Sequence, residues 1–199
     1  GILTFTPVTD ANGTAVVTVR LEDDGGTENG GIDTVIIAFD IAVTAVNDAP
    51  TITAISDPDT ILEDSEEQTV NFGGISTGAA NEDQTLTITA TSSDISIIPN
   101  PTAVYTSPNA EGTLSYTPVA NGNGTATISV IVQDDGGTEN DGLNSDTASF
   151  TVVVTAVNDP PVMADIASQS VDEDESVIVS LVADDVDAED VLVLFAYAD

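Results

Sequence analysis

The chain has 199 residues, of which 35 are acidic and one is basic, so its formal net charge is −34 at pH 7. Proteins bind phosphate groups largely through Lys and Arg, and this composition therefore argues against nucleic acid and anionic membrane surfaces as partners. No apolar stretch of the sequence approaches the ~20 residues that a membrane-spanning helix needs, so we expect no insertion into a membrane.

The composition also limits the available chemistry. The chain has no cysteine and no histidine, which excludes disulfides, thiolate or imidazole metal sites and a Ser-His-Asp arrangement within it. Charge of a single sign opposes compaction, so a folded state needs high salt or bound cations. Disorder is the rival interpretation, but 41% hydrophobic residues in alternating runs argue against it.

A long repeat organises the chain. The run Val-Thr-Ala-Val-Asn-Asp-Ala-Pro at 43–50 returns as Val-Thr-Ala-Val-Asn-Asp-Pro-Pro at 154–161, with an offset of 111 residues. The run Asp-Asp-Gly-Gly-Thr-Glu-Asn at 23–29 returns letter for letter at 134–140. A fixed period of domain length is typical of tandem modules. We therefore expect the C-terminal half of a module at 1–49, a complete module at 50–160 and the N-terminal half of the next at 161–199.

In chain order, the first half-module should contribute two strands, with Ala15, Val17, Val19, Leu21, Phe39, Ile41 and Val43 facing a core. The complete module shows about seven runs bounded by Gly, Asn, Asp and Pro. We expect its strands near 51–55, 68–75, 85–91, 95–105, 112–117, 124–133 and 146–157. Apolar side chains at every second position, with polar ones between, predict antiparallel sheets packed as a sandwich. In the last two strands, the inward positions are Ala126, Ile128, Val130, Val132, Phe150, Val152 and Val154.

The two half-modules cannot close a sandwich by themselves. Each should expose unpaired strand edges unless the flanking chain or a neighbouring molecule completes it.

Acidic residues recur at corresponding loop positions of the modules. These are the linker pairs Asn47-Asp48 and Asn158-Asp159, the pairs Glu63-Asp64 and Glu173-Asp174, the pairs Glu82-Asp83 and Glu189-Asp190, and the pairs Asp23-Asp24 and Asp134-Asp135. Calcium takes 6–8 oxygen ligands, and oxygen ligands are the only kind that this chain offers. We therefore expect calcium at the linkers. The alternative is that these acids are ordinary solvated loop charges.

With these motifs, the chain resembles the cadherin-like, Ig-like tandem repeats of large bacterial surface and secreted adhesins. The resemblance is carried by the linker run at 43–50, the acidic loop at 23–29 and the run Glu-Asp-Gln-Thr-Leu at 82–86. It implies an all-β fold of seven-stranded Greek-key β-sandwiches in a linear array, with one or two calcium ions at each junction. The ligands it implies at the first junction are Asp10, Asn47, Asp48, Glu82, Asp83, Asp134 and Asp135. Those at the second are Glu63, Asp64, Asn121, Asn158, Asp159, Asp184, Asp185, Glu189 and Asp190.

The expected function is mechanical: a calcium-rigidified extracellular stalk of a bacterial surface or secreted adhesin, whose partners are the neighbouring repeats of its own chain. Two alternatives stay open. One is a protomer of a head-to-tail filament, with sandwich halves completed between molecules, and the other is a module that binds cell-surface glycans. Acidic pairs that recur in every module argue against a glycosidase-type carboxylate pair, which normally occurs once, so we expect no enzyme.

Overall fold

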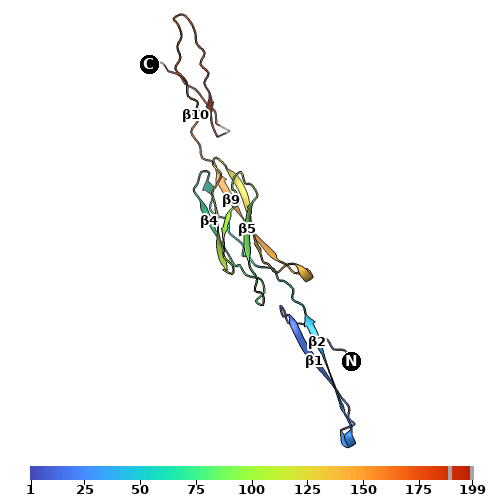
Figure 1. Cartoon of the computed structure of the whole chain (residues 1–199). Coiled ribbons are helices and arrows are strands. Elements are labelled where there is room, and N and C mark those ends of the chain that lie inside the picture. Colours follow the sequence, from blue (N-terminus) through green and yellow to red (C-terminus); the bar gives the residue numbers. More distant parts are fainter. Residues whose placement is uncertain (188–189, 198–199) are drawn as a thin grey trace.

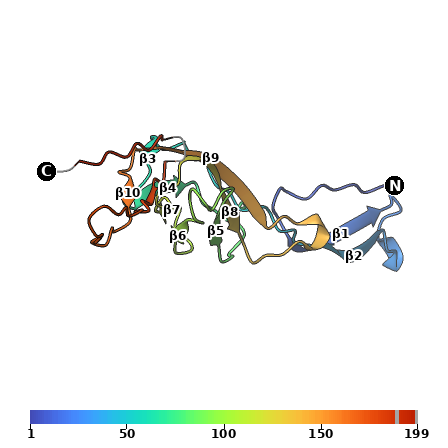
Figure 2. The same cartoon turned by 90° about the horizontal axis from the view of Figure 1, so that it is seen from above.

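The computed structural model describes residues 1–187 and 190–197, which form three parts arranged in a line (Figure 1). The first is a hairpin of β1 (Gly13–Glu22) and β2 (Thr34–Val43), with a short 3₁₀ turn, η1 (Glu28–Gly30), at its tip. A β-sandwich follows, and an extended segment leaves its far end. The view in Figure 2 shows the same linear order from a second direction. Among the described residues, no helix has the length and hydropathy needed to cross a membrane.

The sandwich lies within residues 61–155, all of them described, and has seven strands in two sheets. One sheet has the order β3-β9-β8-β5 and the other β4-β7-β6. Neighbours are antiparallel except for β3, which runs parallel to β9. The strands are β3 (Ile61–Leu62), β4 (Gln68–Gly73), β5 (Thr87–Ser92), β6 (Thr102–Val104), β7 (Glu111–Tyr116), β8 (Gly124–Gln133) and β9 (Ser145–Thr155). The predicted all-β class is confirmed, while Greek-key connectivity stays a prediction.

The alternating pattern positions the core between the sheets. In β8, the side chains of Ile128, Val130 and Val132 are fully buried, whereas Thr125 and Thr127 are exposed and the alternate residues Ser129 and Ile131 are only half-buried. Phe150, opposite Ile128 in the register of β9, is 2% exposed and belongs to the same cluster. From the second sheet, Leu114 of β7 completes this cluster with no exposed surface. The inward-facing side chains of the two sheets therefore form one apolar layer, and the outer faces of the sheets are mainly polar.

The predicted strand at 51–55 is not formed as one element. Thr51 makes an isolated bridge to Ser76, and the Thr53 N–H donates to the Gly73 carbonyl at 3.0 Å, so this stretch follows the edge of β4. The chain then crosses to the other sheet and pairs as β3 with β9. Pro58 falls at the crossing, where it has no N–H to donate to a ladder. The expected strand is thus replaced by an isolated bridge beside β4, and the strand that joins the other sheet, β3, lies after the predicted range.

The predicted strand at 95–105 is also wrong over its first half. The Asp94 carbonyl accepts hydrogen bonds from the N–H groups of Ile97 and Ile98, which closes a turn. Asp94 Oδ1 accepts from the Ser96 N–H at 3.0 Å and its hydroxyl at 2.6 Å, and these bonds lower the pKa of Asp94. The prolines at 99 and 101 follow, so only Thr102–Val104 pairs as β6.

The hairpin β1–β2 repeats the register of β8–β9. Gly13 pairs with Val43 as Gly124 pairs with Val154, 111 residues later. The positions predicted to face a core, from Ala15 to Leu21 and from Phe39 to Val43, do share one face of the hairpin. That face is open, however: Val19 is 45% and Leu21 71% exposed, because no described residue packs across it.

A matched pair of truncations tests this difference between equivalent positions. Val130→Ala should lower the free energy of unfolding of the sandwich by about 2 kcal/mol, since a methyl-lined cavity replaces buried contacts. That corresponds to a fall in melting temperature of roughly 10 °C. Val19→Ala, at the same place in the repeat but exposed, should leave the sandwich melt unchanged. Thermal unfolding followed by circular dichroism gives both values, and equal shifts for the two variants would contradict this burial pattern.

Candidate metal centres at the two junctions

The first junction brings the linker that follows β2 against two loops of the sandwich. Asn47 lies at its centre: Asn47 Nδ2 donates to Asp134 Oδ1 at 3.1 Å and to the Leu143 carbonyl, and Asn47 Oδ1 accepts from Gln84 Nε2. The Leu143 N–H donates to the Asn47 carbonyl at 3.0 Å. The linker is therefore held by side-chain and backbone bonds together. Gln84 and Leu143 were not among the predicted site residues.

Carboxylates on both sandwich loops face this linker. The Asp48 N–H donates to Glu82 Oε1 at 2.9 Å, and the Gly136 N–H donates to Asp134 Oδ1 at 2.9 Å. Asp135 takes a different role, because its Oδ1 accepts from the Thr85 N–H at 2.9 Å and so joins the two loops. Asp134 is 5% exposed, which is unusual for an unpaired acid.

Three buried oxygens at this junction have no hydrogen-bond partner among the described residues: Glu82 Oε2, Gln84 Oε1 and Asp134 Oδ2. A buried oxygen without a donor is costly, and a charged one more so. The single basic side chain, Arg20, is paired with Glu22 on β1 and does not serve them. These oxygens are hard, anionic or amide ligands of the kind that calcium takes. In ligand chemistry, the residues present therefore suit a divalent cation, although among the described residues only the second junction brings three carboxylates within 4.8 Å of one another.

The remaining predicted residues of this junction line two small cavities rather than one shell. A cavity of about 420 Å³ is lined by Asn47, Glu82, Asp83 and Gln84, with Glu139 from the loop after β8. A second cavity, of about 240 Å³, is lined by Asp10 and Asp48 with Asn81, whose amide donates to the Asp10 carbonyl. Asp10 thus lies on the linker side of the junction, apart from Asp134.

The second junction begins on the opposite end of the sandwich, at Glu63. This residue is 3% exposed; its Oε1 accepts from the Val157 N–H at 2.7 Å and its Oε2 from Asn123 Nδ2 at 3.1 Å. Next to it, Asp64 Oδ1 accepts from the Asn121 N–H at 3.1 Å. The predicted Glu63-Asp64 pair therefore binds the start of the linker and the turn before β8.

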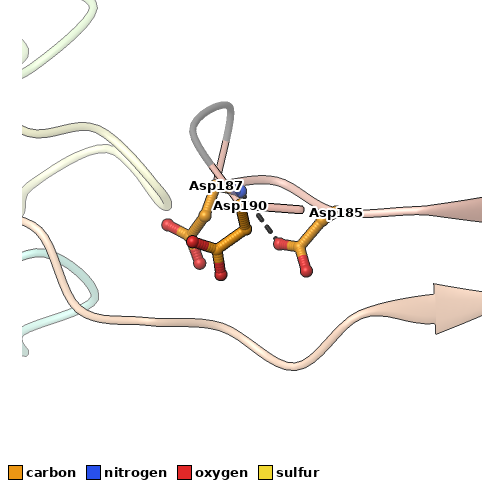
Figure 3. A group of neighbouring side chains, drawn as sticks. All are labelled: Asp185, Asp187 and Asp190. Carbon is orange, nitrogen blue, oxygen red and sulfur yellow. Dashed lines mark hydrogen bonds between the residues drawn. The ribbon is translucent and has the colours of Figure 1, made fainter. Parts of the chain in front are cut away.

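Acids beyond β10 (Val162–Met163) and at β11 (Ala183–Asp184) complete this junction. The carboxylates of Asp185, Asp187 and Asp190 lie with ligand oxygens within 4.8 Å of one another. Figure 3 shows Asp187 and Asp190 side by side, with Asp185 Oδ1 accepting from the Asp187 N–H at 3.0 Å. The Asp159 N–H donates to Asp187 Oδ2 at 2.7 Å, as Asp48 does to Glu82.

Some predicted members of the second set do not join this group. Asp184 is exposed on β11, where its Oδ1 accepts from the Asp185 N–H, and it is not part of the triad. Glu189 lies outside the described residues. Asn158 is exposed, and its amide donates to the Asp159 carbonyl at 3.0 Å. Asp187 was missed, although its alternation with Asp185 signals two carboxylates that point the same way.

Asp159 carries the electrostatic signature of this junction. Its Oδ2 is buried and has no hydrogen-bond partner in the described part of the chain. Removal from water, followed by the charges of Asp64, Asp187, Glu63 and Asp185, raises the pKa of Asp159. A carboxyl whose charge is penalised in this way is one that a bound cation relieves.

The backbone conformations repeat along with the acids. Asp64 and Asp174 have φ of 61° and 67°, and Asp10 and Asn121, 111 residues apart, have φ of 59° and 56°. Asp and Asn adopt this left-handed region more readily than other side chains with a Cβ. The same local scaffold therefore recurs at successive junctions.

Comparisons with known proteins add little beyond this geometry. No family model matches the chain, and no curated protein matches it. Among solved structures, it is similar to the titin domains Z1Z2 in complex with telethonin (17% identity, TM-score 0.37), over 61% of this chain and 55% of that one. It is also similar to domains 4 and 5 of the S-layer protein SbsC (16% identity, TM-score 0.32), over 71% of this chain and 58% of that one. The chain thus spans little more than half the length of these two structures, and at such scores neither carries an argument about function.

Removing the charge of Asp159 should raise the melting temperature, whereas most mutations at a buried site lower it. Because the pKa of Asp159 is raised in the folded state, folding favours its protonated form. The stability that the protonated carboxyl contributes is present at low pH and is lost as the pH rises through the folded-state pKa. In chelator at neutral pH, Asp159→Asn should therefore melt above wild type. The gap should close as the pH falls through the raised pKa of Asp159, where the wild-type carboxyl gains its proton. A variant that melts below wild type at neutral pH in chelator would contradict this.

Proposed function

We propose that the chain is part of a calcium-rigidified extracellular stalk of a bacterial surface or secreted adhesin, built from tandem β-sandwich modules. One observation carries the proposal. At both ends of one sandwich, the junction with an Asn-Asp linker contains a buried carboxylate oxygen that has no donor among the described residues. These oxygens are on Glu82 and Asp134 of the sandwich loops at one end and on Asp159 of the linker itself at the other. Recurrence at both ends fits a joint between modules and does not fit a single catalytic centre.

Calcium would act on the linker rather than on the core. The linker N–H groups of Asp48 and Asp159 already bond to acids of the following module, Glu82 and Asp187. Those acids repel one another in a chain of net charge −34, so without a cation the joint is pushed open. A cation that is shared by the linker and the loops would hold neighbouring modules in one orientation.

The fold suits a spacer. Strands of the sandwich run along the line of the three parts (Figure 1), and β8 and β9 have 10 and 11 residues. At a rise of ~3.3 Å per residue, each module would lengthen the stalk by roughly 35–45 Å. The modules themselves need no conformational change, so the number of modules would set the length and the joints the stiffness.

A second candidate function, a protomer of a head-to-tail filament, is favoured by the hairpin β1–β2. Its face carries Val19, Leu21 and Phe39, exposed by 45%, 71% and 42%, where the equivalent Val130, Val132 and Phe150 of the sandwich are at most 2% exposed. A complementary half-module from another molecule would bury this face, and the association would be open-ended because the two surfaces differ.

Calcium should raise the melting temperature of the chain. Binding to the native state alone stabilises by mass action, and extracellular-type sites have dissociation constants of about 10⁻⁴–10⁻³ M. At about 10 mM calcium, each site then contributes about 1.4 to 2.7 kcal/mol. The measurement compares calcium with chelator, in sodium chloride of matched ionic strength so that simple screening is held constant. Identical melting curves would sink the calcium proposal.

Removing a linker carboxylate should loosen the joint without unfolding the sandwich. Asp48→Ala should broaden the range of interdomain angles in calcium, because Asp48 lies outside the core strands and lines the junction. Small-angle X-ray scattering should give the variant the profile of the chelated wild type. Asp24→Ala removes the same charge from the exposed hairpin tip and should keep the wild-type profile. If Asp48→Ala stays as extended and as narrowly distributed as wild type, the linker aspartates are ordinary solvated charges.

A further inference from the structure

The loop between β8 and β9 surrounds the linker asparagine and has glycines where the asparagine enters. A Cβ on Gly142 would lie 3.0 Å from Asn47 Cβ and 3.1 Å from Asn47 N, and a Cβ on Gly136 would overlap the Asn47 amide. Within this cradle, Asn47 uses both halves of its amide, donating to Asp134 and Leu143 and accepting from Gln84. The geometry is that of a receptor that closes on one side chain.

The equivalent loop at the tip of the hairpin, Asp23–Asp33, has the same conformation without that side chain. The Gly25 N–H donates to Asp23 Oδ1 at 2.8 Å, and the Gly31 N–H to the Glu28 carbonyl at 3.1 Å. The matching bonds in the sandwich, from Gly136 and Gly142, are 2.9 and 3.0 Å long. Asn29 and Asn140 share a left-handed φ, 54° and 57°.

Nothing from another segment enters the hairpin loop. The atoms nearest to a Cβ on Gly25 or Gly31 all belong to residues 23–28 of the loop itself. The backbone of Ile32, which corresponds to Leu143, forms no hydrogen bond with another described residue. The loop therefore has the same conformation without a bound side chain. A receptor that is already ordered loses little conformational entropy when it binds.

We propose that this loop is the receptor of each module for the Asn-Asp-X-Pro linker of the module before it, and that the asparagine is a latch that acts without a metal. In this chain, Asn47 fills the receptor of the sandwich. The loop Asp23–Asp33 is a vacant copy of the loop part of that receptor, with Asp23 and Ile32 in place of Asp134 and Leu143 and with no counterpart of Gln84 among the described residues. The inference rests on the proposed tandem stalk. It adds to that proposal a direct contact between modules that survives removal of calcium.

Asparagine is the side chain that this contact selects. Asp134 Oδ1 and the Leu143 carbonyl are acceptors, so the linker must bring donors, while Gln84 Nε2 requires an acceptor. Aspartate has the same size but no donor, and it would set a second carboxylate against Asp134. Asn47→Asp therefore removes two bonds and adds a repulsion. Asn158, whose amide reaches only the Asp159 carbonyl, supplies the matched control.

Distance measurements across the first junction of the full chain test the latch. The chain has no cysteine, so Thr18→Cys on β1 and Thr89→Cys on β5 can carry a pair of spin labels. Electron–electron dipolar spectroscopy in chelator and high salt should give a narrow distance distribution for the Asn47 chain and one about twice as wide for Asn47→Asp, since small interfaces default to mobility. Asn158→Asp should stay narrow.

A second pair of variants tests the receptor from its own side. Gly136→Ala fills the cradle and should widen the distribution as Asn47→Asp does, whereas Gly25→Ala makes the same change in the vacant loop and should not. The melting temperature of the sandwich confirms that each variant is folded. A distribution in chelator that is as wide for wild type as for Asn47→Asp, or as narrow for Gly136→Ala as for Gly25→Ala, would overturn the latch. A wild-type distribution that calcium leaves unchanged would instead count against the calcium joint and leave the latch standing.

The vacant receptor can be tested directly with a synthetic peptide of the linker sequence Val-Thr-Ala-Val-Asn-Asp-Ala-Pro. In chelator, millimolar peptide should shift the NMR amide signals of Gly25, Gly31 and Ile32 in the intact chain. The peptide with Asp in place of its Asn should shift them several-fold less. Equal shifts from both peptides, or none from either, would show that the loop does not recognise the linker asparagine.

Discussion

The constraint on which this structure depends is the lack of positive charge. With 35 acidic side chains and one basic one, ion pairs within the chain can neutralise almost none of its carboxylates. Those that approach the protein body are instead satisfied by N–H donors: Asp57 by the Thr151 backbone, Asp146 by that of Ile52, and Glu63 by Val157 and Asn123. These hydrogen bonds connect loops to strands, so a carboxylate that has enough N–H donors stabilises the fold. At the two linkers, buried oxygens are left without a donor among the described residues, and these are the positions at which we propose that cations bind.

The predictions from sequence were most accurate where period-two alternation met an uninterrupted strand. The expected strand at 124–133 has the observed bounds, because Ala126, Ile128, Val130 and Val132 all face one core and a register slip would turn every one of them to solvent. The strands at 51–55 and 95–105 failed for a common reason. Pairing there is decided by polar side chains and prolines, through Asp57 and Pro58 in one case and Asp94 in the other, and alternation says nothing about which sheet such a segment joins.

For the candidate sites, the sequence predicted which loops come together but not which side chains in those loops make the contacts. Repetition showed that linkers and acidic loops belong together, and the structure brings Asn47 against Asp134 and Asp159 against Asp187. It could not show that Asp135 accepts from the Thr85 N–H inside the sandwich, or that Asp187 accepts from the linker N–H at the second junction. Small deletions shift residue numbers between modules, whereas the direction of a side chain depends on backbone conformations that only three-dimensional structure reveals. Gln84 was missed because a lone amide in a loop has no signal in sequence.

The two ends of the sandwich are different surfaces, and this difference would explain how an acidic chain could form the linear array that we propose. One end of the sandwich offers the receptor loop after β8 with Glu82, and the other offers Glu63 and Asp64 with an outgoing linker. Contacts between unlike ends cannot be satisfied by pairing two modules face to face, so they extend in one direction. The same-sign charges of the sandwich faces discourage lateral association, because similar surfaces repel. Repulsion that would destabilise a globular oligomer therefore favours a single file of modules, in which the proposed cations and the asparagine contact would act only at the joints.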